Sequence, residues 1–292
     1  MKKRVLTFLT VYSLVVFHTI SCNNENSTKE NEINNPNTAS EAQHSIEIDT
    51  IELDYEFLPP SPVQIASILK KADMHYEEGL TNPASNMNHY STPFKQSLNF
   101  GVYTADLSYC ITNDKYSEAS DYLKTIKKLG SKIGLDAIFQ SNNLVERFEK
   151  NMGNQDSIIE LLFNIQIATD DYIHDNELRD LSVIYFAGAW IELMNIGTHT
   201  IIGNNDKKIS TLLSEQMTIA NSIVKGLNAV KNKNEDLILL TEHLEEVTNE
   251  YNNLWSVKKE GDNIEYLDIE LQHDEVMKIS DKILELRDEI TM

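Results

Sequence analysis

The sequence predicts an all-α protein, an irregular bundle of antiparallel helix hairpins with about eight or nine helices over residues 61–292. Three observations predict this fold class. Apolar residues recur every three or four positions in long segments, which places them on one stripe of a helix. Gly, Asn and Asp separate these segments, and they leave helical dihedrals at little cost. After residue 57, no segment shows the alternation that is typical of a strand.

Residues 1–21 are predicted to be a secretory signal, because three cations in the first four residues precede an uncharged apolar run over residues 5–17. The signal ends at Thr19-Ile20-Ser21-Cys22, which resembles a lipobox with threonine in place of the usual leucine. A lipoprotein signal peptidase cleaves before such a cysteine once it is acylated. We therefore expect lipidation of Cys22 and anchoring in a membrane. An ordinary signal with a chance cysteine, or an uncleaved membrane anchor, is the alternative.

Residues 22–60 are expected to hold the lipidated cysteine, a disordered acidic tether and a short extended arm. Residues 23–42 contain almost no apolar side chain, and such a composition cannot repay the entropy of ordering. Residues 46–57 nearly alternate apolar and acidic side chains, which favours an extended arm. Prolines then end the arm, and Ser61 with Gln64 forms a capping-box pattern that starts the first helix.

The remaining helices are expected at about residues 93–112, 115–133, 137–152, 156–175, 179–202, 206–231, 235–257 and 271–290. Their connections are short, so helices that follow each other in the sequence are expected to be antiparallel neighbours. The last two have the clearest apolar spacing, which predicts a long antiparallel hairpin.

The chain is acidic, with 25 Lys and Arg against 46 Asp and Glu. Removal of the signal takes away three cations and no acids, so the mature formal net charge is −24. This acidity argues against nucleic acid as a partner, and it fits a soluble surface, a basic partner or divalent cations. Cys110 is the only other cysteine in the sequence, so no intramolecular disulfide is possible once Cys22 is lipidated. We expect this thiol to be buried.

The helix at 179–202 is apolar over most of its circumference, which favours a place at the centre of the bundle. A membrane span is disfavoured, because the carboxylate of Glu192 would be costly at the middle of a bilayer. Glu192, Asn195 and His199 are spaced three and four residues apart and share one face. That face either meets water or lines a ligand pocket, in which a carboxylate and an imidazole could act as acid and base.

Asp106 is the second candidate, because it stands among Tyr103, Tyr109 and Cys110 in a largely apolar helix. A carboxylate buried there needs hydrogen-bond donors from neighbouring elements. We therefore expect Asp106 to be a structural hydrogen-bond hub, with catalysis or a ligand contact as the alternatives.

A third group, Asp170, Asp171 and His174, has a spacing that could hold a divalent metal on one helix face. No calcium-loop glycine accompanies it, and further ligands would have to come from elsewhere, so we predict no metal and no cofactor. The sequence also lacks a catalytic triad order, a phosphate loop, a dinucleotide glycine motif and paired cysteines. No catalytic residue is assigned on this basis.

Four segments carry a resemblance: Pro60-Ser61-Pro62-Val63-Gln64-Ile65-Ala66-Ser67, Asn99-Phe100-Gly101-Val102-Tyr103-Thr104-Ala105-Asp106-Leu107-Ser108-Tyr109, Arg147-Phe148-Glu149 with Asn154-Gln155-Asp156-Ser157, and Ala187-Gly188-Ala189-Trp190-Ile191-Glu192. In these the chain resembles a group of uncharacterised all-helical lipoproteins of Bacteroidota. Ala189 stands where the group is expected to have a second glycine. The resemblance implies a helical fold, an envelope location and no assigned activity. It also favours Tyr103, Asp106, Tyr109, Trp190 and Glu192 as ligand-contacting residues.

We expect the chain to be a binding or scaffolding module of the cell envelope with a protein partner there. Asn23 follows the lipidated cysteine in place of the aspartate that retains some lipoproteins at the inner membrane, which favours the outer membrane, on either face. The alternative is an enzyme or small-ligand receptor with an interhelical pocket lined by Asp106, Glu192, Asn195 and His199. Two short segments of this chain, Asp49-Thr50-Ile51 and Asp156-Ser157-Ile158, also resemble the O-glycosylation sites of Bacteroidota.

Overall fold

The computed structural model describes residues 62–71, 74–140, 143–203, 207–258 and 269–292. Contacts along the chain divide it into Met1–Leu53 and Asp54–Met292, and every described residue belongs to the second unit. The signal, Cys22, the tether, the arm and Ser61 lie outside the described residues. Within the described residues the all-α prediction is confirmed, because they form helices and no strand.

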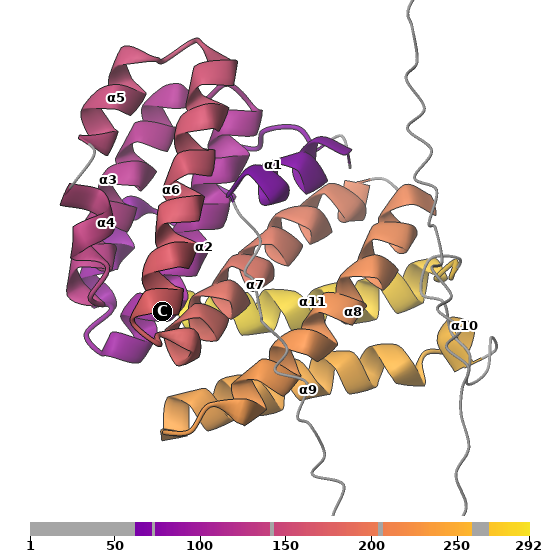
Figure 1. Ribbon diagram of the computed structural model, residues 1–292. Coiled ribbons are helices and arrows are strands. Elements are labelled where there is room, and N and C mark those ends of the chain that lie inside the picture. The colour runs from indigo at the N-terminus through magenta and orange to yellow at the C-terminus, as the bar shows by residue number, and fades with distance from the viewer. Residues whose placement is uncertain (1–61, 72–73, 141–142, 204–206, 259–268) are drawn as a thin grey trace, which may run out of the picture. The chain divides into compact units, whose positions relative to one another are not determined.

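The helices follow the predicted order along the chain (Figure 1). They are α1 (Pro62–Lys71), the 3-10 helix η1 (Ala84–His89), α2 (Pro93–Thr112), α3 (Tyr116–Lys132), α4 (Asp136–Gln140), α5 (Leu144–Lys150), α6 (Gln155–Asp175), α7 (Arg179–Gly203), α8 (Lys207–Ala229), α9 (Glu235–Asn253), α10 (Trp255–Lys258) and α11 (His273–Thr291). Local signals explain several starts. For example, Pro93 is at the first position of α2, and the Thr92 hydroxyl accepts a hydrogen bond from the Lys95 N–H.

Two helices predicted as continuous are interrupted. The segment predicted at 137–152 forms two helices, α4 and α5. Asn143, directly before α5, has a left-handed φ of 45°, which a continuous α-helix cannot contain. The segment predicted at 235–257 breaks at Leu254, whose ψ of 146° is extended. There the Ser256 N–H donates to Glu275 Oε1 of α11 at 2.9 Å, so a residue from another helix replaces the bond that a continuous helix would make.

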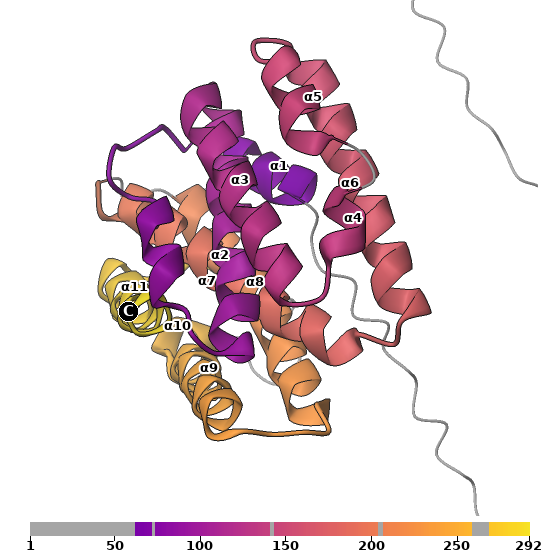
Figure 2. The same ribbon diagram turned by 90° about the vertical axis from the view of Figure 1, so that its left-hand side faces the viewer.

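Helix α7 packs against α1, α2, α6, α8 and α11, and Figures 1 and 2 show it among them. Its segment Arg179–His199 is the one described stretch long and apolar enough to cross a membrane, but 89% of its most apolar window is buried inside the protein. A helix that is apolar all round must be covered on every side. The prediction of a central core helix is confirmed.

Glycines bring α2 and α7 into backbone contact. A Cβ atom added to Gly101 of α2 would lie 1.7 Å from the Tyr185 carbonyl oxygen, and one added to Gly188 of α7 would lie 1.9 Å from the Leu98 carbonyl oxygen. No side chain fits in either place. Each helix therefore contributes one glycine to the contact.

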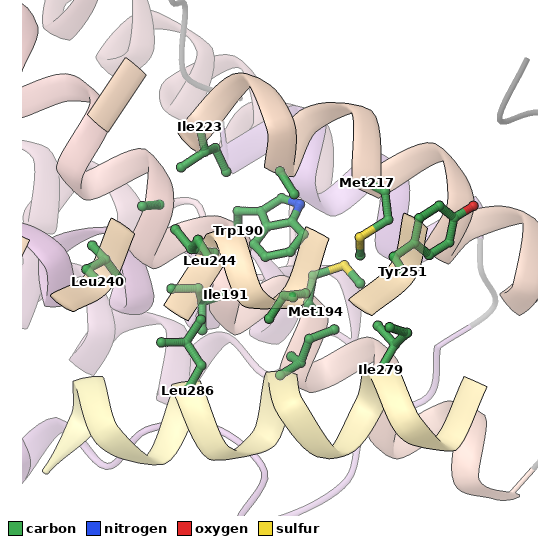
Figure 3. Packing of buried hydrophobic residues seen from close by; sticks show 14 of the residues in the cluster. Trp190, Ile191, Met194, Met217, Ile223, Leu240, Leu244, Tyr251, Ile279 and Leu286 are labelled. Atoms are coloured by element: carbon green, nitrogen blue, oxygen red, sulfur yellow. The ribbon is translucent and has the colours of Figure 1, made fainter. Parts of the chain in front are cut away.

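The largest apolar cluster lies where α7 packs against α8, α9 and α11 (Figure 3). Trp190, Ile191 and Met194 of α7 contribute to it, together with side chains of α8, α9 and α11. A second cluster joins α2 to α3, α4, α5, α6 and α7, and a third joins α1, α2 and α7. Because α2 and α7 contribute to all three clusters, they are the shared centre of the packing.

The predicted pairing of the last two long helices is confirmed by ion pairs. His243 Nδ1 lies 2.8 Å from Glu289 Oε2, and Lys282 Nζ lies 3.4 Å from Glu246 Oε2. A later residue of α9 pairs with an earlier residue of α11, so the two helices are antiparallel. Exposed pairs of this kind add little stability, and the apolar stripes between the helices supply most of the attraction.

We predict that Gly101→Ala destabilises the protein by about 1–3 kcal/mol or more, because the new methyl group would overlap the α7 backbone. Gly197→Ala on α7 is the matched control. Its Cβ would make an ordinary contact of 3.5 Å with Met74, so helix propensity predicts a small gain of up to about 1 kcal/mol. Urea denaturation of both variants measures the difference. Equal stabilities would contradict the close contact.

Candidate functional site

Three ionisable side chains meet where α2, α7 and α11 pack together: Asp106, Glu192 and Arg287. Arg287 donates from Nε to Glu192 Oε2 at 3.0 Å and from Nη2 to Glu192 Oε1 at 3.4 Å. Asp106 and Glu192 are fully buried, whereas the Arg287 side chain is 16% exposed. We call this set the Asp106–Glu192–Arg287 cluster. The guanidinium neutralises one of its two carboxylates.

Asp106 faces the second carboxylate. Its Oδ2 atom accepts a hydrogen bond from the Asn82 N–H at 3.3 Å, and its Oδ1 atom receives none from a described residue. Burial raises the pKa of Asp106 well above its usual value, the charge of Glu192 raises it further, and Arg287 lowers it only in part. Two carboxylates can bond to each other only through a proton. We infer that Asp106 is a neutral acid that donates to Glu192, which makes the cluster neutral.

Two tyrosines of α2 fix the irregular segment between α1 and η1. The Tyr109 hydroxyl donates to the His75 carbonyl at 2.7 Å and accepts from the Glu77 N–H at 2.8 Å. The Tyr103 hydroxyl donates to the Pro83 carbonyl at 3.0 Å. Residues 74–83 form no helix or strand, so side chains of α2 supply partners for several of their backbone groups.

The same network reaches the end of α11. Asn82 Nδ2 donates to the Tyr90 hydroxyl at 2.9 Å, and this hydroxyl donates to the Thr291 carbonyl at 3.2 Å. Asn99 Nδ2 donates to the Ile290 carbonyl at 2.8 Å. The last carbonyls of a helix have no partner within that helix. Side chains from α2 and from the segment before it therefore donate hydrogen bonds to the last carbonyl groups of α11.

The predicted polar stripe of α7 is buried. Asn195 is 2% exposed, and its Nδ2 atom donates to Glu192 Oε1 at 3.2 Å. His199 is half-buried, and its Nδ1 atom lies 3.0 Å from the Asn195 carbonyl oxygen of its own helix. The interpretation that this stripe meets water is wrong for Glu192 and Asn195. The side chains are joined to one another and to α11.

The other predicted contact residues diverge. Trp190 is 2% exposed and lies in the cluster with α8, α9 and α11. Tyr103, also fully buried, belongs to the cluster with α3 and α4, whereas Tyr109 belongs to the cluster with α1. The structure thus brings Asp106, Glu192 and Asn195 together, and it turns the aromatic residues towards different parts of the core.

Sequence reasoning missed Arg287, Asn82, Tyr90 and Asn99. A signal for Arg287 was present, because it lies on the same stripe of α11 as the buried Ile283 and Leu286. A cation among core positions requires an anion from another helix. No comparable signal marks Asn82 or Tyr90, because they lie in an irregular segment.

The predicted metal candidates do not come together as a site. Asp170 accepts a hydrogen bond from Gln166 at 2.7 Å, and burial raises its pKa, while the exposed His174 lies 3.5 Å from Asp175. The described residues contain no group of three His, Cys, Asp or Glu side chains that could hold a metal ion. Cys110 is fully buried as predicted, and burial raises the pKa of its thiol strongly, which opposes formation of a thiolate.

Neither of two described hollows is lined by Asp106 or Glu192. An apolar cavity between α2, α3, α6 and α7 has a volume of about 40 Å³ and includes Phe100, Leu162 and Tyr185 in its wall. This volume is far below the roughly 150 Å³ of a cavity that takes up benzene. A hollow of about 110 Å³ between α9 and α11 is lined mostly by polar and charged side chains, among them Glu246 and Lys282.

The burial of the Asp106–Glu192–Arg287 cluster limits the reactions that it could catalyse. A general acid or base must come within hydrogen-bond reach of a substrate, directly or through one water molecule. Both carboxylates are fully buried, and the described contacts of Glu192 are to protein groups. The arrangement matches the predicted structural hub, and it locks α2, α7 and α11 in one register.

The sequence matches no protein-family model, no curated protein and no solved structure. The resemblance to lipoproteins of Bacteroidota therefore stays a prediction from the quoted segments. Conclusions about function depend on the residues and contacts of this chain.

We predict that Asp106→Asn makes stability less dependent on pH. In the folded protein Asp106 keeps a proton that it loses when unfolded, so stability falls by up to about 1.4 kcal/mol per pH unit as pH rises above the usual aspartate pKa towards the raised one. Asn resembles the neutral acid and does not titrate. The variant should therefore gain relative to the native protein between pH 5 and pH 8 in urea denaturation. The exposed Asp171→Asn is the control, and parallel pH profiles for all three proteins would oppose a neutral Asp106.

We also predict that Arg287→Met destabilises the protein by about 3–5 kcal/mol, because Glu192 would be left buried and unpaired. Replacing both partners, in Glu192→Met with Arg287→Met, should recover a large part of that loss because no lone charge remains. Thermal and urea unfolding of the two variants give the comparison. A double variant that is no better than the single one would show that the ion pair is not the cause.

Proposed function

We propose that this chain is a lipid-anchored binding or scaffolding module of the cell envelope, held at the outer membrane through Cys22. The sequence supports the anchor through the charged start, the apolar run and the lipobox-like residues before Cys22. Acyl chains on one cysteine hold a protein firmly, because each buried methylene contributes about 0.8 kcal/mol.

The observation that carries the binding role is the burial of the candidate carboxylates. Asp106 and Glu192 are fully buried, and the contacts described for them are to other parts of the domain. These groups then stabilise the domain, and any interaction with another molecule has to use its surface. We therefore favour binding over catalysis.

The described surface offers apolar side chains for such binding. Large apolar residues that are more than a third exposed include Met152, Ile159, Phe163, Ile167, Ile238, Leu239 and Trp255. Single exposed apolar residues are normal, but groups of them on one face are typical of interaction sites. The strong negative charge also favours a basic partner over nucleic acid.

We predict that Cys22→Ala abolishes acylation and also abolishes cleavage before residue 22, because the signal peptidase requires the acylated cysteine. Cys110→Ala is the matched control, because it removes the other thiol and should leave the chain in the membrane. Mass spectrometry of the mature amino terminus and density-gradient separation of the two membranes measure these properties. An unmodified Cys22 in the native chain, or a Cys22→Ala variant that is still cleaved before residue 22, would contradict the lipid anchor.

A further inference from the structure

Helix α6 is apolar on two faces. One face is buried by Ile158, Leu161 and Leu162. Beyond it, Ile159, Phe163 and Ile167 are 37%, 53% and 44% exposed. We call these three residues the α6 stripe. They are four positions apart, so they form one continuous line along the helix.

The apolar cavity lies on a neighbouring face of α6, and no residue of the stripe lines it. Leu162 and Gln166 line the cavity, and each directly precedes a residue of the stripe, Phe163 and Ile167. The wall also holds the Tyr185 hydroxyl, which is buried and has no hydrogen-bond partner among the described residues.

The carboxylates of α6 lie close to the stripe. Helix α6 contains Asp156, Glu160, Asp170, Asp171 and Asp175 and no Lys or Arg. On a helical projection Asp156 and Asp170 lie at the two ends of the stripe, and Glu160 and Asp171 lie along one flank. An apolar line with acidic ends and one acidic flank is complementary to an apolar line that carries basic residues in the matching positions.

We propose that the α6 stripe binds an amphipathic helix of another envelope protein, one with aliphatic side chains on its inner face and Lys or Arg on its flanks. This inference depends on the proposed binding function. The chain's own arm at residues 46–57 is a poorer occupant, because its polar residues are acidic apart from Thr50. A second copy would place the same acidic flanks against each other.

The test is photo-cross-linking in intact cells that make the full-length chain. A photoreactive phenylalanine analogue replaces Phe163, and mass spectrometry sequences the peptide that it captures. We expect a peptide of a different protein with three-four apolar spacing and Lys or Arg on its flanks. A peptide from this chain, a peptide with acidic flanks, or the absence of a cross-linked product would overturn the proposal.

Paired substitutions separate the stripe from general surface charge. Ile167→Glu and Asn164→Glu each add one negative charge to an exposed position of α6, but Asn164 lies outside the stripe. In the chain with the probe at position 163, Ile167→Glu should lower the cross-link yield by about tenfold, and Asn164→Glu by less than about twofold. Equal yields would overturn the proposal. Circular dichroism melting confirms that both variants fold.

A second probe position separates this proposal from the proposed function. Leu239 on α9 is 44% exposed and lies outside α6. Capture of a specific protein from position 239 but not from position 163 would keep the binding function and remove the α6 stripe as its site. No capture at either position, with lipidation of Cys22 demonstrated, would remove both.

Discussion

The backbone contact between α2 and α7 fixes the centre around which the described helices pack. Because Gly101 and Gly188 each face a carbonyl of the other helix, the two backbones are closer than a side chain at either position would allow. This approach brings Asp106 to Glu192 in the interior, where their charges cannot be solvated. A cation and a proton are then needed to balance the two carboxylates.

The polar network around these carboxylates stabilises a particular arrangement more than it adds net stability. Burying an ion pair costs hydration that its attraction repays only with good geometry, but a helix in the wrong register would leave the charges unpaired. Arg287 fixes α11 on α7, and Asn82 fixes the irregular segment on α2. Tyr90 and Asn99 then satisfy the buried end of α11. A network of this kind explains ionisable residues in a core without requiring a reaction.

The interior and the surface of the domain differ in the side chains that they hold. The residues that could do chemistry are buried, whereas α6 exposes Phe163 and its neighbours between acidic residues. Water solvates acidic side chains well and aliphatic ones poorly, so this face would gain from a basic amphipathic partner. A lipid on Cys22 would keep such a surface near its partner and so raise the effective concentration.

The sequence by itself determined the helices, because spacing, caps and breaks are local properties. It also identified Asp106 and Glu192, since an ionisable residue in an apolar helix is unusual wherever the helix lies. Only the tertiary structure decided their partner, because Arg287 is 95 positions from Glu192 in the sequence. It also decided which helix covers each face of α7. A helix that is apolar all round has no periodicity that assigns its faces to particular neighbours, so the packing makes that choice.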